Sequence, residues 1–198
     1  SMFLPDKSIF STIKTDLKAI TKKIKERAYL VAGLFFHVYD LRSDQEIHYY
    51  FDGGIESLVR HLNKNKAWVN ERPFYVSKEI NGILVEASLQ YNDGYNETIE
   101  SFANVINTAE GGTHLTGFRM ALTRSINDYA RKNGYLKEKD DNLSGEDMRE
   151  GLTAVVAIKM NSENLQFEGQ TKGKLGNAEI QPAVHQAVKE GLDTYLEE

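Results

Sequence analysis

Three stretches of the chain carry apolar residues at the three- and four-residue spacing of an amphipathic helix. They predict helices over residues 16–31, over residues 114–132 and from about residue 178 toward the end of the chain. The apolar positions are Leu17, Ile20, Ile24, Ala28 and Val31; Leu115, Phe118, Leu122, Ile126 and Tyr129; and Ile180, Val184, Val188, Leu192 and Tyr195. Gly53-Gly54 is expected to open a fourth, short helix.

Two helix starts are predicted from side-chain chemistry. Thr113 precedes the 114–132 helix, and we expect its hydroxyl to accept a hydrogen bond from an early backbone N–H. Ser144 is followed three residues later by Asp147, a spacing that predicts a reciprocal cap on a short helix.

The remaining apolar stretches predict strands. These stretches are residues 34–40, 45–51, 74–80, 83–91, 99–106 and 152–160. Asn81-Gly82 joins two of them, and this dipeptide favours a tight hairpin because both residues tolerate positive φ. Within 83–91 apolar and polar residues alternate, which predicts one buried face and one solvent face. The 152–160 stretch has little polarity on either face and is therefore expected at the centre of the sheet.

Together these elements predict an α+β fold, with a mixed or antiparallel sheet and helices on one side. The chain has 198 residues, enough for one domain with a substantial core. We therefore expect residues 1–198 to form a single domain.

Composition narrows the class of protein. Hydrophobic residues make up 40% and charged residues 27%, as in soluble globular domains. The formal net charge of −5 argues against extensive non-specific DNA binding. Cysteine is absent, which excludes disulfides and fits a reducing compartment such as the cytoplasm, and we expect no membrane association. Met2 in second place and the missing helix stop at the end are expected of an expressed fragment.

Most familiar catalytic patterns are missing. No two histidines stand at the spacing of a metal motif, so we interpret all five as structural or surface residues: His37, His48, His61, His114 and His185. There is no nucleophile elbow and no phosphate loop ending in Lys-Ser or Lys-Thr. Glu110-Gly111-Gly112-Thr113 precedes a helix whose N-terminus attracts anions in principle, but a tight turn is the favoured interpretation.

The stretch from Phe167 to Asn177 is a glycine-rich loop between the apolar 152–160 run and the last helix. It carries Lys172 and Lys174. A lysine ammonium on such a loop suits a terminal phosphate. Solvated lysines in a turn are the alternative, and composition alone favours it.

Several short motifs, which occur in the same order as in a known family, favour phosphate binding by this loop. Gln170-Thr171-Lys172 resembles the Gln-Thr-Lys loop of the ATPase subunit of bacterial type IIA DNA topoisomerases, which are gyrase and topoisomerase IV. Other blocks follow in the family's order: Tyr91-Asn92-Asp93-Gly94-Tyr95, Glu110-Gly111-Gly112-Thr113-His114-Leu115, Gly117-Phe118-Arg119, Leu143-Ser144-Gly145-Glu146-Asp147 and Phe167-Glu168-Gly169. The resemblance is specific from Tyr91 to Asn177 and looser from Phe3 to Ile83. It corresponds to the family's transducer domain, which follows the ATP-binding domain.

This resemblance implies a fold and a site. The fold would be like domain two of ribosomal protein S-five, with a left-handed βαβ crossover. Gln170 and Lys172 would reach the γ-phosphate of ATP, held with Mg²⁺ by the ATP-binding domain, and Lys172 would act in catalysis. Residues 178–198 would be the exit helix. The family's nucleotide pocket would precede Phe3, so we expect no ATP binding and no hydrolysis by this chain alone.

The resemblance also implies partners and a function. The partners are the N-terminal ATP-binding domain of the same subunit, a second copy that dimerises with ATP, the DNA-cleaving A-type subunit and duplex DNA in a transport cavity. Arg119 matches a family arginine that lines this cavity, while pairing with a carboxylate is its alternative role. The domain would couple ATP hydrolysis to DNA strand passage and supercoiling. A stand-alone small-molecule kinase and a ribosomal-like nucleic-acid-binding module remain alternatives, and gyrase and topoisomerase IV both remain open.

Overall fold

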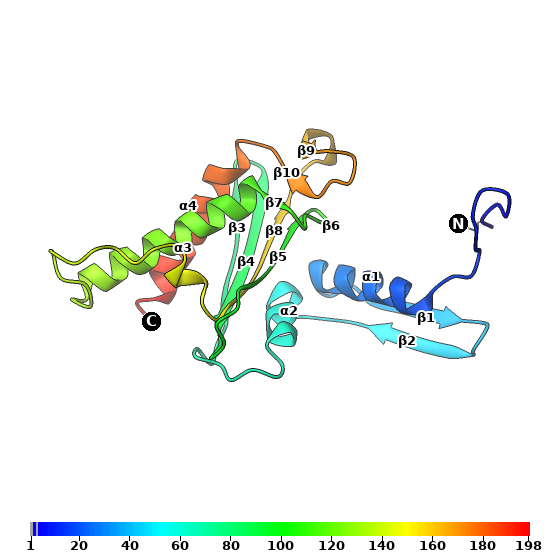
Figure 1. Ribbon diagram of the computed structural model, residues 1–198, viewed down its shortest axis with the longest axis horizontal. Helices are drawn as coiled ribbons and strands as arrows, with labels where there is room; N and C mark the ends of the chain where they lie inside the picture. Colours follow the sequence, from blue (N-terminus) through cyan, green and yellow to red (C-terminus); the bar gives the residue numbers. More distant parts are fainter. Residues whose placement is uncertain (1, 3) are drawn as a thin grey trace.

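A five-stranded sheet with the order β3-β4-β8-β5-β6 forms the centre of the computed structural model, which describes residue 2 and residues 4–198 (Figure 1). Phe3-Leu4 followed by Pro5-Asp6 is typical of a strand end and a turn, and the Phe3 part of this prediction lies outside the described residues. The strands of the sheet are β3 (Phe74–Ile80), β4 (Ile83–Tyr91), β5 (Thr98–Ala103), β6 (Ile106–Asn107) and β8 (Leu152–Lys159).

The pairing of β8 makes this sheet mixed, as predicted. It runs antiparallel to β4 and parallel to β5. The chain passes from β5 to β8 through α3 (Thr113–Lys132), which forms the βαβ crossover. The handedness of this crossover stays a prediction. Seven of the eight residues of β8 are buried, which confirms its central place.

The hairpin between β3 and β4 has the predicted bounds and turn. Asn81 and Gly82 have φ values of 51° and 76°, the left-handed pair that this turn requires. Register follows directly, with Ile80 opposite Ile83 and Phe74 opposite Leu89.

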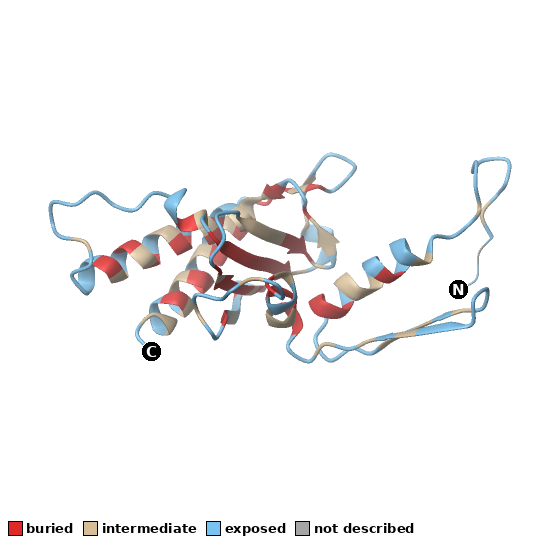
Figure 2. Cartoon of the chain, turned by 60° about the horizontal axis from the view of Figure 1, so that its bottom comes forward, coloured by how far each residue is buried: buried red, intermediate tan, exposed pale blue. Residues whose placement is uncertain are grey.

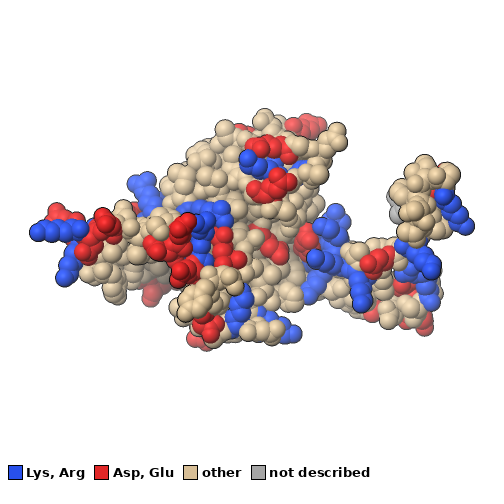
Figure 3. All heavy atoms as spheres, in the orientation of Figure 1, with Lys and Arg blue, Asp and Glu red and all other residues tan. Residues whose placement is uncertain are grey.

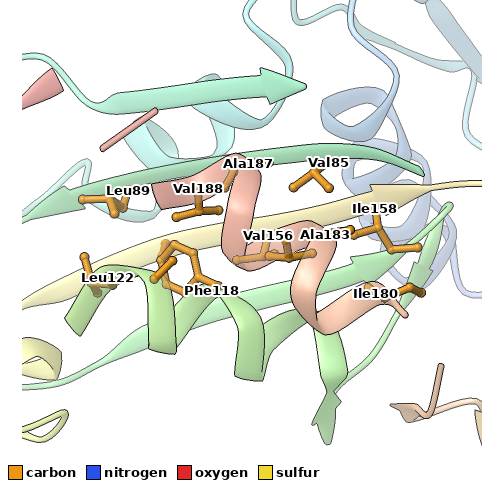
Figure 4. Close-up of a cluster of buried hydrophobic side chains, with 14 of the residues drawn as sticks. Val85, Leu89, Phe118, Leu122, Val156, Ile158, Ile180, Ala183, Ala187 and Val188 are labelled. Carbon is orange, nitrogen blue, oxygen red and sulfur yellow. The ribbon is translucent and has the colours of Figure 1, made fainter. Parts of the chain in front are cut away.

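Helices α3 and α4 (Ile180–Tyr195) cover one face of the sheet and enclose the main core. Figure 4 shows Phe118 and Leu122 of α3 and Ala183 and Val188 of α4 gathered against the apolar side chains of β4 and β8. The two helices cross closely at Gly117, where an added Cβ would lie 2.4 Å from the carbonyl oxygen of Gln181. Only glycine allows this approach, so Gly117 determines how closely α4 packs on α3.

The other face of the sheet is also covered. Helix α2 (Gly54–Leu62) and the end of α1 (Leu17–Leu30) pack there on Phe102, Val155 and Ala157. The expectation of helices on one side of the sheet is therefore confirmed for α3 and α4. Helix α2 and the end of α1 cover the opposite face, which was not predicted.

The prediction that one face of β4 is exposed to solvent is wrong for the C-terminal half of the strand. Ser88 and Gln90 are fully buried. Gln90 accepts a hydrogen bond from Asn63 of the α2 end at 3.1 Å, and Thr153 donates to the Asn63 side-chain oxygen at 2.6 Å. Gln90 therefore points inward because hydrogen bonds with Asn63 and with the Asn70 carbonyl satisfy its amide. The Ser88 hydroxyl is buried without a hydrogen-bond partner among the described residues.

The two predicted helix caps have different outcomes. Ser144 accepts from the backbone of Glu146 and Asp147, both at 3.2 Å, while Asp147 accepts from the Ser144 N–H at 2.6 Å, which confirms the reciprocal cap at the 3₁₀ turn Asp147–Arg149. The prediction that Thr113 caps α3 is wrong. Gly112 is the N-cap, and the Thr113 hydroxyl has no hydrogen-bond partner among the described residues.

A limb formed by α1, β1 (Phe36–Asp40) and β2 (Gln45–Tyr49) projects from the body (Figure 1). The buried residues of α1 are Thr21 and, at its C-terminal end, Ala28, Tyr29 and Leu30. Figure 2 shows the hairpin itself as largely exposed. Residues 17–49 are called the limb below. None of the helices described is both long and apolar enough to cross a membrane.

Candidate functional site

The glycine-rich loop lies at the tip of a small hairpin beside the main sheet. Strands β9 (Phe167–Glu168) and β10 (Lys174–Leu175) pair antiparallel, and β10 also pairs with β7 (Gly111–Gly112). Leu175 is fully buried in the main core, so the base of the hairpin is fixed. The residues at the tip, Gln170, Thr171 and Lys172, are all exposed.

The base of the hairpin also depends on glycine at position 112. Its φ is 137°, and an added Cβ would lie 2.3 Å from the carbonyl oxygen of Leu175. The Glu110-Gly111-Gly112-Thr113 segment therefore forms the tight turn that the sequence favoured. The hollow at this turn is lined by two carboxylates, Glu110 and Glu168, and by two cations, Arg119 and Lys174. Both cations already form ion pairs, Arg119 with Glu97 and Lys174 with Glu168, so the hollow has no excess of positive charge for an anion.

The tip has a defined backbone. The Lys172 N–H donates to the Gly169 carbonyl at 3.4 Å, and both residues have positive φ, 55° for Lys172 and 78° for Gly169. For a residue with a Cβ this conformation costs about 1 kcal/mol. Lys172, which adopts this unfavourable conformation, is the residue to which the family resemblance assigns phosphate contact.

The structure separates the two lysines of the loop. The ammonium of Lys174 lies 3.0 Å from the Glu168 carboxylate across the hairpin. The side chain of Lys172 makes no hydrogen bond or ion pair within the described residues, and its ammonium lies 5.7 Å from the centre of the Phe167 ring. Of these two lysines, Lys172 is thus the one available to a phosphate from outside the chain.

Asn177 joins the hairpin to the last helix. It is fully buried, its side-chain oxygen accepts from the Gln166 N–H at 2.7 Å, and its side-chain nitrogen donates to the Asn164 carbonyl at 2.8 Å. Helix α4 begins three residues later. This role was not predicted, because the glycine-rich sequence around Asn177 is typical of a loop and gives no sign of a buried residue.

Arg119 lies on α3 and forms an ion pair with Glu97 at 2.8 Å. It also lines an open groove of about 560 Å³ together with Arg124, Asn127, Asn142 and His185. Acidic and basic side chains are interleaved over the body in Figure 3, and basic side chains gather over α1. Both interpretations of Arg119 thus have support, since it has a carboxylate partner and also faces a groove.

The histidines differ in their surroundings. His114 is fully buried, its Nε2 lies 2.9 Å from the Thr108 hydroxyl, and burial lowers its pKa to about 4. His37 and His48 lie opposite each other on β1 and β2 with Glu46 beside them. Sequence spacing gave no sign of this pair, because the chain reverses between them.

Comparisons with known proteins agree with this architecture. The family model for DNA gyrase B matches residues 54–198. The chain is 52% identical over 197 residues to the DNA gyrase B protein of Clostridium acetobutylicum, covering 99% of this chain and 31% of that protein. This chain belongs to the DNA gyrase B family. It spans about a third of the curated relatives that it matches.

Solved structures of gyrase B and topoisomerase IV share the fold. The 43K ATPase domain of Thermus thermophilus gyrase B, in complex with an aminocoumarin, superposes with a TM-score of 0.86 at 40% identity, over 98% of this chain and 51% of that one. The ATP-binding domain of Francisella tularensis topoisomerase IV gives a TM-score of 0.82 at 27% identity, over 98% and 51% of the two chains. The chain is therefore homologous to part of the ATPase region in these enzymes.

Proposed function

We propose that this chain is the transducer part of a type IIA DNA topoisomerase ATPase subunit, and that Gln170 and Lys172 reach the γ-phosphate of ATP bound by the preceding domain. The observation that carries the proposal is the exposed ammonium of Lys172, unpaired within the described residues, on a hairpin whose base is buried. ATP with Mg²⁺ is the expected ligand of the complete enzyme, and this chain supplies two side chains to it.

The chemistry of the tip fits this role. Lys172 is a point charge that stabilises negative charge developing on a departing phosphoryl group. Gln170 has an amide that donates a hydrogen bond to a phosphate oxygen. Both contacts depend on the γ-phosphate and end when it leaves, so the hairpin distinguishes ATP from ADP.

A change at the tip of the β9–β10 hairpin would be transmitted along the chain to α4. The β9–β10 hairpin is connected to α4 by two buried residues: Leu175 packs in the main core, and Asn177 hydrogen-bonds to the backbone of Gln166. The close approach at Gly117 fixes α4 against α3. A shift of the hairpin therefore moves the exit helix (residues 178–198) as a unit toward the DNA-cleaving A-type subunit. We assign residues 1–198 to one transducer domain, with its core in the body that the family model matches.

The complete subunit would then couple ATP hydrolysis to strand passage and supercoiling. ATP binding would dimerise two copies of the subunit, and the transported duplex would pass between their transducer domains. Arg119 would meet DNA phosphates at the groove on α3 during this passage.

The split site makes a direct prediction for the chain as it stands. Titration with a non-hydrolysable ATP analogue and Mg²⁺ in a calorimeter should give no detectable heat at millimolar nucleotide, because Gln170 and Lys172 are two donors without a pocket. A longer chain that includes the ATP-binding domain should bind the same analogue. Micromolar binding by the 198 residues alone would contradict the proposal and would favour a stand-alone kinase.

A second prediction concerns Arg119. In the full subunit, Arg119→Ala should leave basal ATP turnover unchanged and lower DNA-stimulated turnover several-fold, with the loss largest at low salt because the contact is electrostatic. Glu97→Gln is the matched control: it releases Arg119 from its ion pair and should preserve the DNA response. Equal loss in both variants would mean that the ion pair is structural and that Arg119 does not contact DNA.

A further inference from the structure

We propose that the exposed face of the limb hairpin carries a site for a divalent transition metal such as Zn²⁺, with His37, Glu46 and His48 as its ligands. The three side chains come from two strands and meet on one face of the hairpin. This site is independent of the ATP-directed loop, which lies on the body.

Strand register brings the ligands together. His37 is directly opposite His48, and Glu46 stands two residues before His48, so its side chain points to the same face of the ribbon. One carboxylate oxygen of Glu46 lies 2.7 Å from Nε2 of His37 and 2.9 Å from Nε2 of His48. The three candidate ligand atoms all lie within 4.8 Å of one another.

The face is turned away from the rest of the chain. Along β1 the intermediate residues Phe36, Val38 and Asp40 alternate with the exposed residues His37 and Tyr39. The ligand side chains therefore have room for the small rotations that would bring each donor atom to about 2.0–2.2 Å from a shared ion. Asp44 is engaged elsewhere, since it accepts a hydrogen bond from Tyr39, so it is not a fourth ligand here.

Ligand chemistry selects the ion. Two imidazole nitrogens and one carboxylate form a common protein donor set for Zn²⁺, with water in the remaining position. Mg²⁺ prefers an octahedron of oxygen ligands and should not compete. As plain surface ion pairs, the same contacts would contribute little to stability.

A bound ion would also strengthen an element that is weak alone. The hairpin has two strands of five residues each, and an isolated two-stranded ribbon is marginal in water. An ion coordinated by His37 on β1 and by Glu46 and His48 on β2 would cross-link the strands.

The test is a ZnCl₂ titration of the untagged chain in competition with a chromogenic chelator. We expect one equivalent of Zn²⁺ bound per chain, unchanged by millimolar Mg²⁺. His37→Gln, Glu46→Gln and His48→Gln should each weaken binding at least about tenfold. His61→Gln and His185→Gln are matched controls, on α2 and α4, and should bind as the wild-type chain does.

The controls separate this site from adventitious binding. Circular dichroism checks that each variant is folded, and all three ligand positions are exposed, so the substitutions should be tolerated. Absence of stoichiometric binding would overturn the proposal. Retained binding in any of the three ligand variants would also overturn it, and loss in His61→Gln or His185→Gln would place the ion elsewhere.

Discussion

Lys172→Ala in the full-length subunit should lower the rate of ATP turnover about 100-fold or more, because the substitution removes the charge that we propose acts on the departing phosphoryl group. Loss of one such electrostatic donor costs about 10²–10³ in kcat. Steady-state ATP hydrolysis at saturating nucleotide measures the effect. The KM for ATP should change less than kcat, because the contact strengthens as charge develops.

The fold should survive this substitution. The Lys172 side chain is exposed and makes no hydrogen bond or ion pair within the described residues. Its left-handed backbone is no harder for alanine than for lysine, since both side chains carry a Cβ. The thermal unfolding midpoint of the variant should therefore stay close to that of the wild type.

Lys174→Ala is the matched control for charge. Lys174 stands two residues away on the same hairpin, but its ammonium is paired with Glu168. Its removal should leave turnover near the wild-type rate. Wild-type turnover by Lys172→Ala, or an equal loss in both variants, would remove the catalytic role assigned to Lys172.

The order and type of the main elements could be predicted because their patterns are local. The hairpin over residues 74–91 followed from Asn81-Gly82, and the central place of β8 followed from its continuous apolar run. The solvent face of β4 could not be predicted in the same way. Gln90 is buried because Asn63, which is 27 residues away, hydrogen-bonds to it, and no local pattern reveals such a partner.

The candidate site was predicted in part. The family resemblance assigned the phosphate contact to Lys172, whereas the composition of the loop does not distinguish Lys172 from Lys174. The two lysines differ in the structure because Lys174 forms a cross-strand ion pair with Glu168. Asn177 and Glu97 act through contacts with residues 11 and 22 positions away. The pair His37 and His48 was missed because strand register brings these residues together, while their spacing along the chain matches no metal motif.

Acidification from pH 7 to pH 5 should destabilise the body, and His114 should account for about 2 kcal/mol of the loss in the free energy of unfolding. The folded chain holds this imidazole neutral, since burial lowers its pKa from 6.5 to about 4. The unfolded chain binds a proton below about pH 6.5 and the folded chain does not until about pH 4. The stability contributed by the neutral imidazole is therefore complete above pH 6.5 and falls with pH, by about 3 kcal/mol in total.

Burial lowers the pKa of His114, and the hydrogen bonds around the ring offer no acceptor for a second proton. The Thr108 hydroxyl donates to the Ser101 carbonyl at 2.8 Å, so Nε2 of His114 carries the proton that this hydroxyl accepts. Nδ1 has no partner among the described residues. A second proton would thus create a buried charge and a donor with no acceptor.

Urea unfolding followed by circular dichroism at pH 7, 6 and 5 measures this contribution when the wild type is compared with His114→Gln. The glutamine amide keeps a donor near Thr108 and does not titrate. The variant is expected to be less stable at pH 7 because its shape differs, but its stability should fall about 2 kcal/mol less between pH 7 and 5. Carboxylates whose pKa is lowered, such as Glu190, titrate mainly below this window and are common to both proteins, so they cancel in the comparison. Equal pH dependence in the two proteins would mean that His114 is protonated in the folded chain, and that the buried cluster with Ser101 and Thr108 opens to water.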